Sequence, residues 1–139
     1  MTLLDTNLLS EMMKPVPFQP VVVWLAAQPP EALFTTAVSQ AELLYGVQSL
    51  PRGRRRTQLE EQVEKMLAID FEGRILPFDE PAARAFATIS SGRKRAGRPM
   101  SPFDTLIAAI ALSHGADLAT RNTKDFEGCG VRLINPWDL

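Results

Sequence analysis

The chain lacks several sequence features, and each absence excludes a class of protein. Its 139 residues include a single cysteine, Cys129, so no internal disulfide framework can form, and a reducing cytoplasmic compartment is expected. No apolar run approaches the roughly 20 residues that a membrane-spanning helix needs. An acid within the first five positions is untypical of a signal peptide. We therefore expect a cytoplasmic protein that has no membrane partner.

Strong basic charge and histidine are also scarce. The formal net charge is −1, which removes the simplest signature of a nucleic-acid-binding protein, a strongly basic chain. Any such function has to depend on local charge. The one histidine, His114, precedes Gly115 at the end of an apolar helix, where both residues are expected to cap the helix. Catalysis of the Ser/His/Asp type would depend on this one residue and is not indicated.

Short apolar segments alternate with helical patterns along the chain, which predicts an α/β fold with a mostly parallel central sheet and helices on both faces. The segments expected to form strands, each followed by a helical pattern, are residues 2–4, 33–38, 74–78 and 117–121. Further helices are expected over residues 21–28 and 59–70, and one after Ser101. With 45% hydrophobic residues and no linker or repeat, we expect a single domain over residues 1–139.

Three acids share one kind of position in this pattern. Asp5 follows an apolar strand, whereas Glu42 and Asp104 lie three residues after Ser39 and Ser101, where helices are expected to begin. The Ser-x-x-acid spacing fits a capping box, which is a purely structural explanation. Carboxylates gathered at one sheet edge would instead repel one another unless a cation joins them, and oxygen ligands with few histidines suit Mg²⁺ or Mn²⁺. From the spacing alone, capping and metal binding both remain open.

Four motifs in order give the chain a recognisable signature: Leu3-Leu4-Asp5-Thr6-Asn7, Ser39-Gln40-Ala41-Glu42-Leu43-Leu44-Tyr45-Gly46, Asp104-Thr105-Leu106-Ile107-Ala108-Ala109 and Thr120-Arg121-Asn122-Thr123-Lys124-Asp125-Phe126. Together they resemble the PIN-domain family, and most of all the VapC-type toxins of bacterial toxin-antitoxin modules, including the FitB-like branch. The likeness runs from Asp5 to Trp137. It implies a metal-dependent endoribonuclease that hydrolyses RNA phosphodiester bonds by metal-activated water, leaving a 5′-phosphate and a 3′-hydroxyl.

The same resemblance implies roles for particular residues. Asp5, Glu42 and Asp104 are expected to be the acidic ligands of Mg²⁺, with Mn²⁺ as an alternative. Many relatives carry a further acid where this chain has Asn122, so either Asp125 supplies the missing charge or the site works with three acids and Asn122. In the second case Asn122, with Thr6 and Thr120, would orient ligands or water. The expected partners are RNA, a cognate VapB-like antitoxin and a second copy of the chain in a homodimer.

Two basic clusters could contact RNA. Arg52 to Arg56 fits an exposed loop and helix end, which is the interpretation that we favour for it. The second cluster comes shortly before Ser101 and Asp104, so it is expected to hold phosphates beside the metal site; its basic residues are Arg93, Lys94, Arg95 and Arg98. No aromatic residue lies within either cluster, so base stacking is not indicated there.

The sequence is also compatible with two other functions. The amide at position 122 could mark a degraded site, which would make the chain a catalytically silent PIN-like module that binds RNA or protein. An aspartate after the first strand also occurs in phosphoryl-accepting α/β phosphatases, but these need a second aspartate two residues later, where this chain has Asn7. Phosphorylation of Asp5 would be the observation that favours this last class.

Overall fold

Five short strands form one parallel sheet at the centre of the molecule. The computed structural model describes residues 1–139, and the strands lie in the order β3-β2-β1-β4-β5. Their bounds are β1 Thr2–Leu4, β2 Leu33–Thr36, β3 Ile75–Leu76, β4 Asp117–Ala119 and β5 Leu133–Ile134. Every neighbouring pair is parallel, which confirms the predicted fold class.

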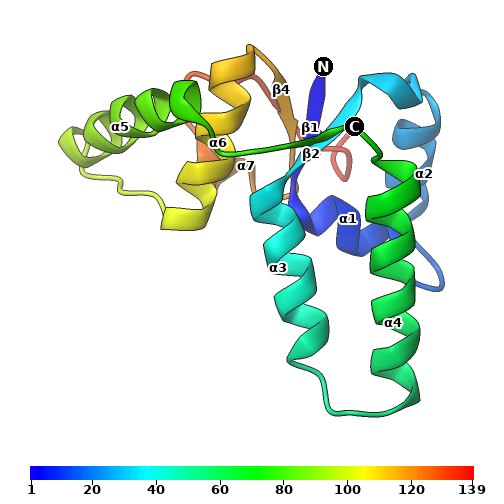
Figure 1. The fold of residues 1–139 in the computed structure, drawn as a ribbon. Coiled ribbons are helices and arrows are strands. Elements are labelled where there is room, and N and C mark those ends of the chain that lie inside the picture. Colours follow the sequence, from blue (N-terminus) through cyan, green and yellow to red (C-terminus); the bar gives the residue numbers. More distant parts are fainter.

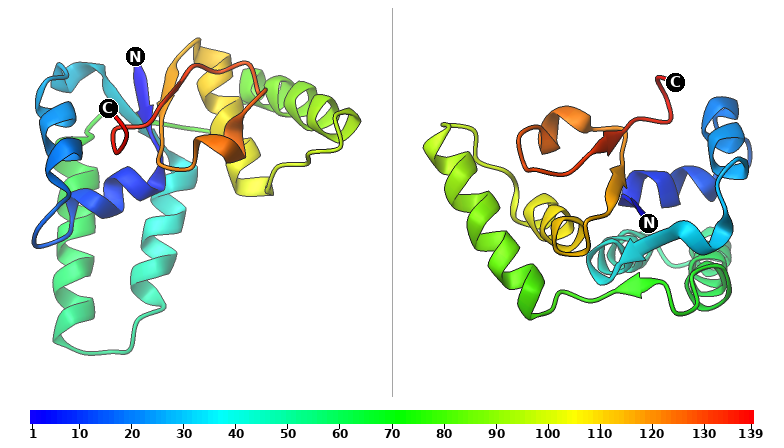
Figure 2. Two further views of the ribbon diagram at one scale, coloured as in Figure 1. Left: turned by 180° about the vertical axis from the view of Figure 1, so that it is seen from behind. Right: turned by 90° about the horizontal axis from the view of Figure 1, so that it is seen from above.

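Helices connect the strands and cover both faces of the sheet. They are α1 Thr6–Met12, α2 Gln19–Ala26, α3 Ala37–Gln48, α4 Arg54–Lys65, α5 Glu80–Arg95, α6 Pro102–His114 and α7 Thr123–Phe126, with a 3-10 turn at Pro30–Ala32 and a π-helical turn at Met66–Asp70 that continues α4. Figure 1 and the left view of Figure 2 show α3 and α4 as an antiparallel hairpin that projects from the sheet, while α5 lies against α6 on the other side. No helix is long and apolar enough to span a bilayer.

Consecutive strand residues alternate between two buried clusters, because side chains along a strand point to opposite faces. Leu3 and Leu118 pack into the cluster that α5 and α6 cover. Leu4 and Ala119, the next residues, pack into the cluster formed with α1, α2, α3 and α4. Burial on both faces explains why these strands are apolar throughout and have no polar alternation.

The strand order creates a switch point between β1 and β4. From β1 the chain moves outward through β2 and β3, then returns to the other side of β1 for β4 and β5. In open parallel sheets, ligands bind at the carboxyl ends of the strands on either side of such a point. Here those ends are followed directly by Asp5 and Thr120.

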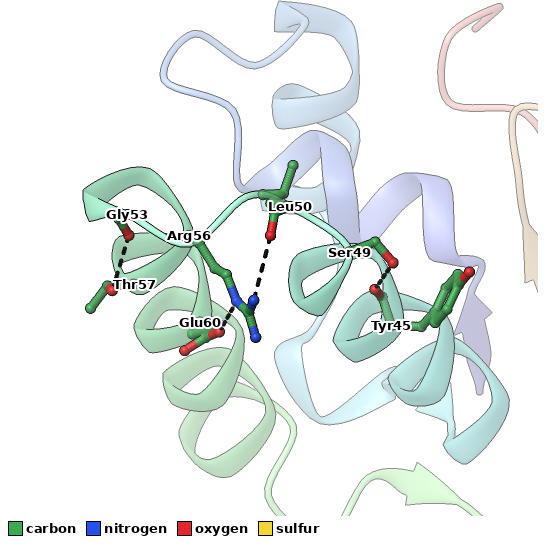
Figure 3. Close-up of polar contacts among 7 residues, drawn as sticks. All are labelled: Tyr45, Ser49, Leu50, Gly53, Arg56, Thr57 and Glu60. Carbon is green, nitrogen blue, oxygen red and sulfur yellow. Dashed lines mark hydrogen bonds and ion pairs between the residues drawn. The ribbon is translucent and has the colours of Figure 1, made fainter.

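The first basic cluster, Arg52 to Arg56, lies in the turn between α3 and α4 and at the start of α4. The Nε of Arg56 donates to Glu60 Oε1 at 2.7 Å, and its Nη1 donates to the Leu50 carbonyl at 3.5 Å (Figure 3). The Ser49 hydroxyl donates to the Tyr45 carbonyl at 2.7 Å at the end of α3. The sequence predicts an exposed loop and helix end for this cluster; it lies in the turn and in the N-terminal end of α4, where Arg56 has a structural role.

Candidate active site

Asp5 is a buried carboxylate at the switch point of the sheet. Its side chain is only 5% exposed. Its Oδ1 accepts the Thr6 N–H at 2.8 Å, and its Oδ2 accepts the Thr120 hydroxyl at 2.7 Å and Asn7 Nδ2 at 3.4 Å. Burial raises the pKa of Asp5 to about 6, although the bonds from Thr120 and Thr6 lower it and the charges of Asp104 and Glu42 raise it further.

Glu42 reaches the same region from α3. The Thr6 hydroxyl lies 2.7 Å from Glu42 Oε1 and 3.0 Å from the Ser39 hydroxyl, so it joins the first residue of α1 to α3. Thr6 therefore contacts two predicted ligands, Glu42 through its side chain and Asp5 through its backbone N–H. The threonine after β1 links the two acids, which supports its predicted orienting role.

The capping prediction for Glu42 is wrong, and the correction favours a functional role. The residue that caps α3 is Thr36, whose hydroxyl accepts the Ser39 N–H at 3.1 Å. The helix starts at Ala37, two residues before Ser39, because β2 ends in parallel pairing between Thr36 and Leu76. Glu42 consequently lies in the second turn of α3, where no free amide at the helix start needs its carboxylate.

Asp104 lies in the first turn of α6, where the capping prediction is half right. Ser101 is the N-cap and accepts the Asp104 N–H at 3.2 Å, and Pro102 occupies the first helical position. The return bond of a capping box, from the Ser101 N–H to the Asp104 carboxylate, is not formed. Burial raises the pKa of Asp104, the Ser101 hydroxyl lowers it, and the nearby charge of Asp125 raises it. The carboxylate therefore remains available to a ligand.

One cavity of about 410 Å³ brings these acids together. It is lined by Asp5, Thr6, Asn7, Ser10, Glu11, Lys14, Glu42, Asp104, Arg121, Asn122 and Trp137. A larger hollow of about 970 Å³ lies between the end of α1 and α4, but it contains none of the three predicted ligands. The chemistry of the smaller cavity makes it the candidate site.

The acids do not stand in a ready coordination cluster, since no three Asp, Glu, His or Cys side chains are arranged as metal ligands. They also have no cationic partner: the five ion pairs of the protein include none of Asp5, Glu42, Asp104 or Asp125. A buried carboxylate without a countercharge is costly. The donor set therefore fits a hard divalent cation, which would have to draw the carboxylates toward it.

Asn122 and Asp125 are the two candidates for completing the site beside the three acids, and they lie in different places. Asn122 lines the cavity, and its N–H donates to the Thr120 hydroxyl at 3.1 Å. Asp125 is exposed in α7 and does not line the cavity, although its charge reaches Asp104. The geometry thus favours a site of three acids and Asn122, with Asp125 close by.

The prediction that Arg93 binds RNA is not supported. Arg93 is 8% exposed, and its guanidinium donates to the backbone carbonyls of Arg98, at 2.6 Å, and of Glu127. These bonds tie the end of α5 to the segment after α7. Lys94, Arg95 and Arg98 are exposed, and Arg98 lies 3.3 Å from Glu127 in an ion pair.

Arg121 and Trp137 are among the residues that line the cavity but had no role predicted from the sequence. Arg121 belongs to the motif that supplied Thr120 and Asn122, and Trp137 ends the segment Asn135-Pro136-Trp137. The motifs were visible, but nothing in the sequence indicates that the last residues fold back beside the ends of β1 and β4. The guanidinium carbon of Arg121 lies 5.5 Å from the centre of the Trp137 ring.

Comparison with known proteins gives one consistent result. The PIN domain family matches residues 2–128. The chain is 40% identical over 138 residues to VapC ribonuclease Y4jK of Sinorhizobium fredii, and 42% identical over 137 residues to toxin FitB of Neisseria gonorrhoeae; each alignment covers 99% of both chains. The crystal structure of FitAcB from Neisseria gonorrhoeae matches with a TM-score of 0.94 at 42% identity, over 100% of each chain.

Proposed function

The chain belongs to the PIN-domain family, and from this we propose that it is an endoribonuclease toxin of a bacterial toxin-antitoxin module. The observation that carries the proposal is that Asp5, Glu42 and Asp104 line one cavity and that none of them forms an ion pair. The names of the similar proteins, a VapC ribonuclease and a toxin, agree with it. We propose that it acts in the cytoplasm, where RNA is the substrate.

The three acids would hold Mg²⁺ or Mn²⁺, and we propose that cleavage depends on it. Such an ion supplies neutralisation of the phosphoryl oxygens and activation of the attacking water near neutral pH. The chain has no histidine in the cavity that could act as a general base. Its residues therefore contribute positioning and charge.

Hydrogen bonds from neighbouring residues fix the positions of Asp5 and Glu42. Thr120 and the Thr6 N–H donate to the two oxygens of Asp5, and the Thr6 hydroxyl donates to Glu42. At Asp5 the bonds from Thr120 and Thr6 lower the carboxylate pKa, so they oppose the effect of burial. Partners of this kind that orient metal ligands typically contribute about 10- to 100-fold to affinity or activity.

The partners follow from the same assignment. We propose a cognate VapB-like antitoxin that silences the toxin, and a homodimer as the functional unit. Coexpression with the gene for a small antitoxin beside this one should rescue growth of cells that express the toxin. Failure of every such gene to rescue growth would count against the toxin assignment.

The activity is tested by mixing purified protein with single-stranded RNA in EDTA, Mg²⁺ or Mn²⁺. Cleavage should occur only with the metal and should leave 5′-phosphate ends. Asp104→Asn should abolish it, whereas Asp70→Asn, an exposed acid that does not line the cavity, should not. Cleavage that persists in EDTA would refute metal dependence. Binding of RNA without any cleavage would favour the silent PIN-like module.

A further inference from the structure

Arg121 is the basic residue on the cavity wall that forms no ion pair. The cavity has two basic residues, and Lys14 is already held by Glu11 at 3.0 Å. Arg121 makes no ion pair, although its charge helps to lower the pKa of Glu11, behind the hydrogen bonds from the Phe18 amide and Lys14. No ion pair joins Arg121 to Asp5, Glu42 or Asp104.

The surrounding segment holds Arg121 in place at its backbone and at its side chain. Its N–H donates to Asn7 Oδ1 at 3.4 Å, and its carbonyl accepts Asn135 Nδ2 at 3.4 Å. Asn135 Oδ1 in turn accepts the Trp137 N–H at 3.0 Å. The guanidinium lies over the Trp137 ring, a stacking that arginine favours and that leaves the N–H groups at its edge free to donate.

Because RNA carries a negative charge on every phosphate, a basic residue that forms no ion pair, such as Arg121, would favour RNA binding beside the three acids. An RNA strand that enters the cavity brings several phosphates toward the negative charges of Asp5, Glu42 and Asp104. The divalent ion that the three acids would hold would neutralise the charge of the phosphate that is cut. A neighbouring phosphate needs its own countercharge, and a stacked guanidinium offers two parallel donors that match phosphate geometry.

We propose that Arg121, held by Trp137, binds the RNA phosphate next to the one that is cut. This inference rests on the proposed ribonuclease function and extends it to a substrate subsite. Arg121 is a binding residue, and Trp137 is a positioning residue that acts through it.

Binding is measured with a labelled single-stranded RNA of about 12 nucleotides and the Asp104→Asn protein in Mg²⁺, so that no cleavage occurs. Adding Arg121→Gln should weaken binding about tenfold, as the loss of a charge-assisted bond predicts. It should also reduce the slope of log affinity against log salt by about 0.7. Trp137→Leu should weaken binding alone but add little to Arg121→Gln.

The matched control is Arg132→Gln, which removes an equal charge from an exposed arginine that pairs with Asp117 at the opposite ends of the strands. It should bind RNA within about twofold of the parent protein. Equal affinity of the Arg121→Gln and Arg132→Gln proteins would overturn the proposal.

A small phosphodiester separates this subsite from the catalytic centre. Bis(p-nitrophenyl) phosphate has one phosphate and cannot occupy a neighbouring-phosphate subsite, so Arg121→Gln in the otherwise wild-type protein should lose much more activity on the RNA than on this small substrate. Equal loss on both substrates would refute the neighbouring-phosphate assignment. If the wild-type protein cuts neither substrate, the proposed function itself fails.

Discussion

Replacement of Asp5 by asparagine should stabilise the metal-free protein while removing its activity. The pKa of this buried carboxyl is about 6, against an ordinary value of 3.8. A difference of about two units corresponds to roughly 3 kcal/mol between the protonated and ionised forms. An asparagine side chain would avoid that cost, but its amide NH₂ would face the Thr120 hydroxyl and lose a hydrogen bond of about 1 kcal/mol. The net gain above pH 7 is about 2 kcal/mol.

The sign of the effect depends on pH. Between the unfolded pKa and the folded pKa, the folded state binds a proton that the unfolded state has released, so the free energy of unfolding falls as pH rises from about 4 to about 7. Below about pH 4 this penalty is absent and the substitution costs its lost hydrogen bond. We therefore expect Asp5→Asn to melt slightly below wild type at pH 4 and about 4–8 °C above it at pH 8.

The assay is a melting series from about pH 4 to pH 8 in EDTA and in Mg²⁺, with Asp70→Asn as control. Mg²⁺ at ten times its dissociation constant should stabilise wild type and Asp70→Asn by about 1.4 kcal/mol at pH 8, but not Asp5→Asn. Two results would contradict the expected burial penalty and metal site: Asp5→Asn melting below wild type at every pH, or equal stabilisation of all three proteins by Mg²⁺.

Four other substitutions have defined outcomes. Thr120→Val removes the donor to Asp5, so RNA cleavage should fall about 10- to 100-fold and the acidic limb of its pH-rate profile should move to higher pH. Glu42→Gln keeps an oxygen for Thr6 but loses a charge, so Mg²⁺-dependent cleavage should fall at least about 100-fold with little change in melting temperature. Arg93→Ala removes the donor to the Arg98 and Glu127 carbonyls and should lower the free energy of unfolding, measured in urea, by about 1–3 kcal/mol without altering the salt dependence of RNA binding. Asn122→Asp adds an acid to the cavity, so calorimetry should find tighter Mn²⁺ binding and a lower melting temperature without metal.

The fold could be predicted from the sequence because local and long-range preferences agree. The alternation of apolar segments with helical patterns predicts the parallel sheet, and Ser101, Pro102 and Gly115 mark both ends of α6. Strand β5, at Leu133–Ile134, is not predicted because no helical pattern follows it, whereas the equally short β3 is followed by the pattern of α5.

The boundaries that failed were decided by tertiary contacts. Thr36 and Ser39 are both suitable N-caps for α3, and only the pairing of β2 with β3 selects the former. The burial of Arg93 likewise depends on carbonyls more than 30 residues away in the chain. Local sequence contains neither piece of information.

The acids of the candidate site could be predicted, but part of their surroundings could not. Asp5, Glu42 and Asp104 occur in motifs that point to one sheet edge, and the structure places them on one cavity. The roles of Arg121 and Trp137 depend on the return of the C-terminal segment to the ends of β1 and β4. The return depends on tertiary contacts, such as those of Arg121 with Asn135 and Trp137, which the local sequence does not contain.

Everything proposed for this protein depends on acids from three separate elements forming one divalent-cation site. Electron paramagnetic resonance tests this directly by measuring free Mn²⁺ during titration with wild type, Asp5→Asn, Glu42→Gln, Asp104→Asn and the Asp70→Asn control. Wild type and the control should bind Mn²⁺ equally, and each of the other three variants should bind it at least about tenfold more weakly. Wild-type affinity in all of the variants would show that the three acids hold no common ion.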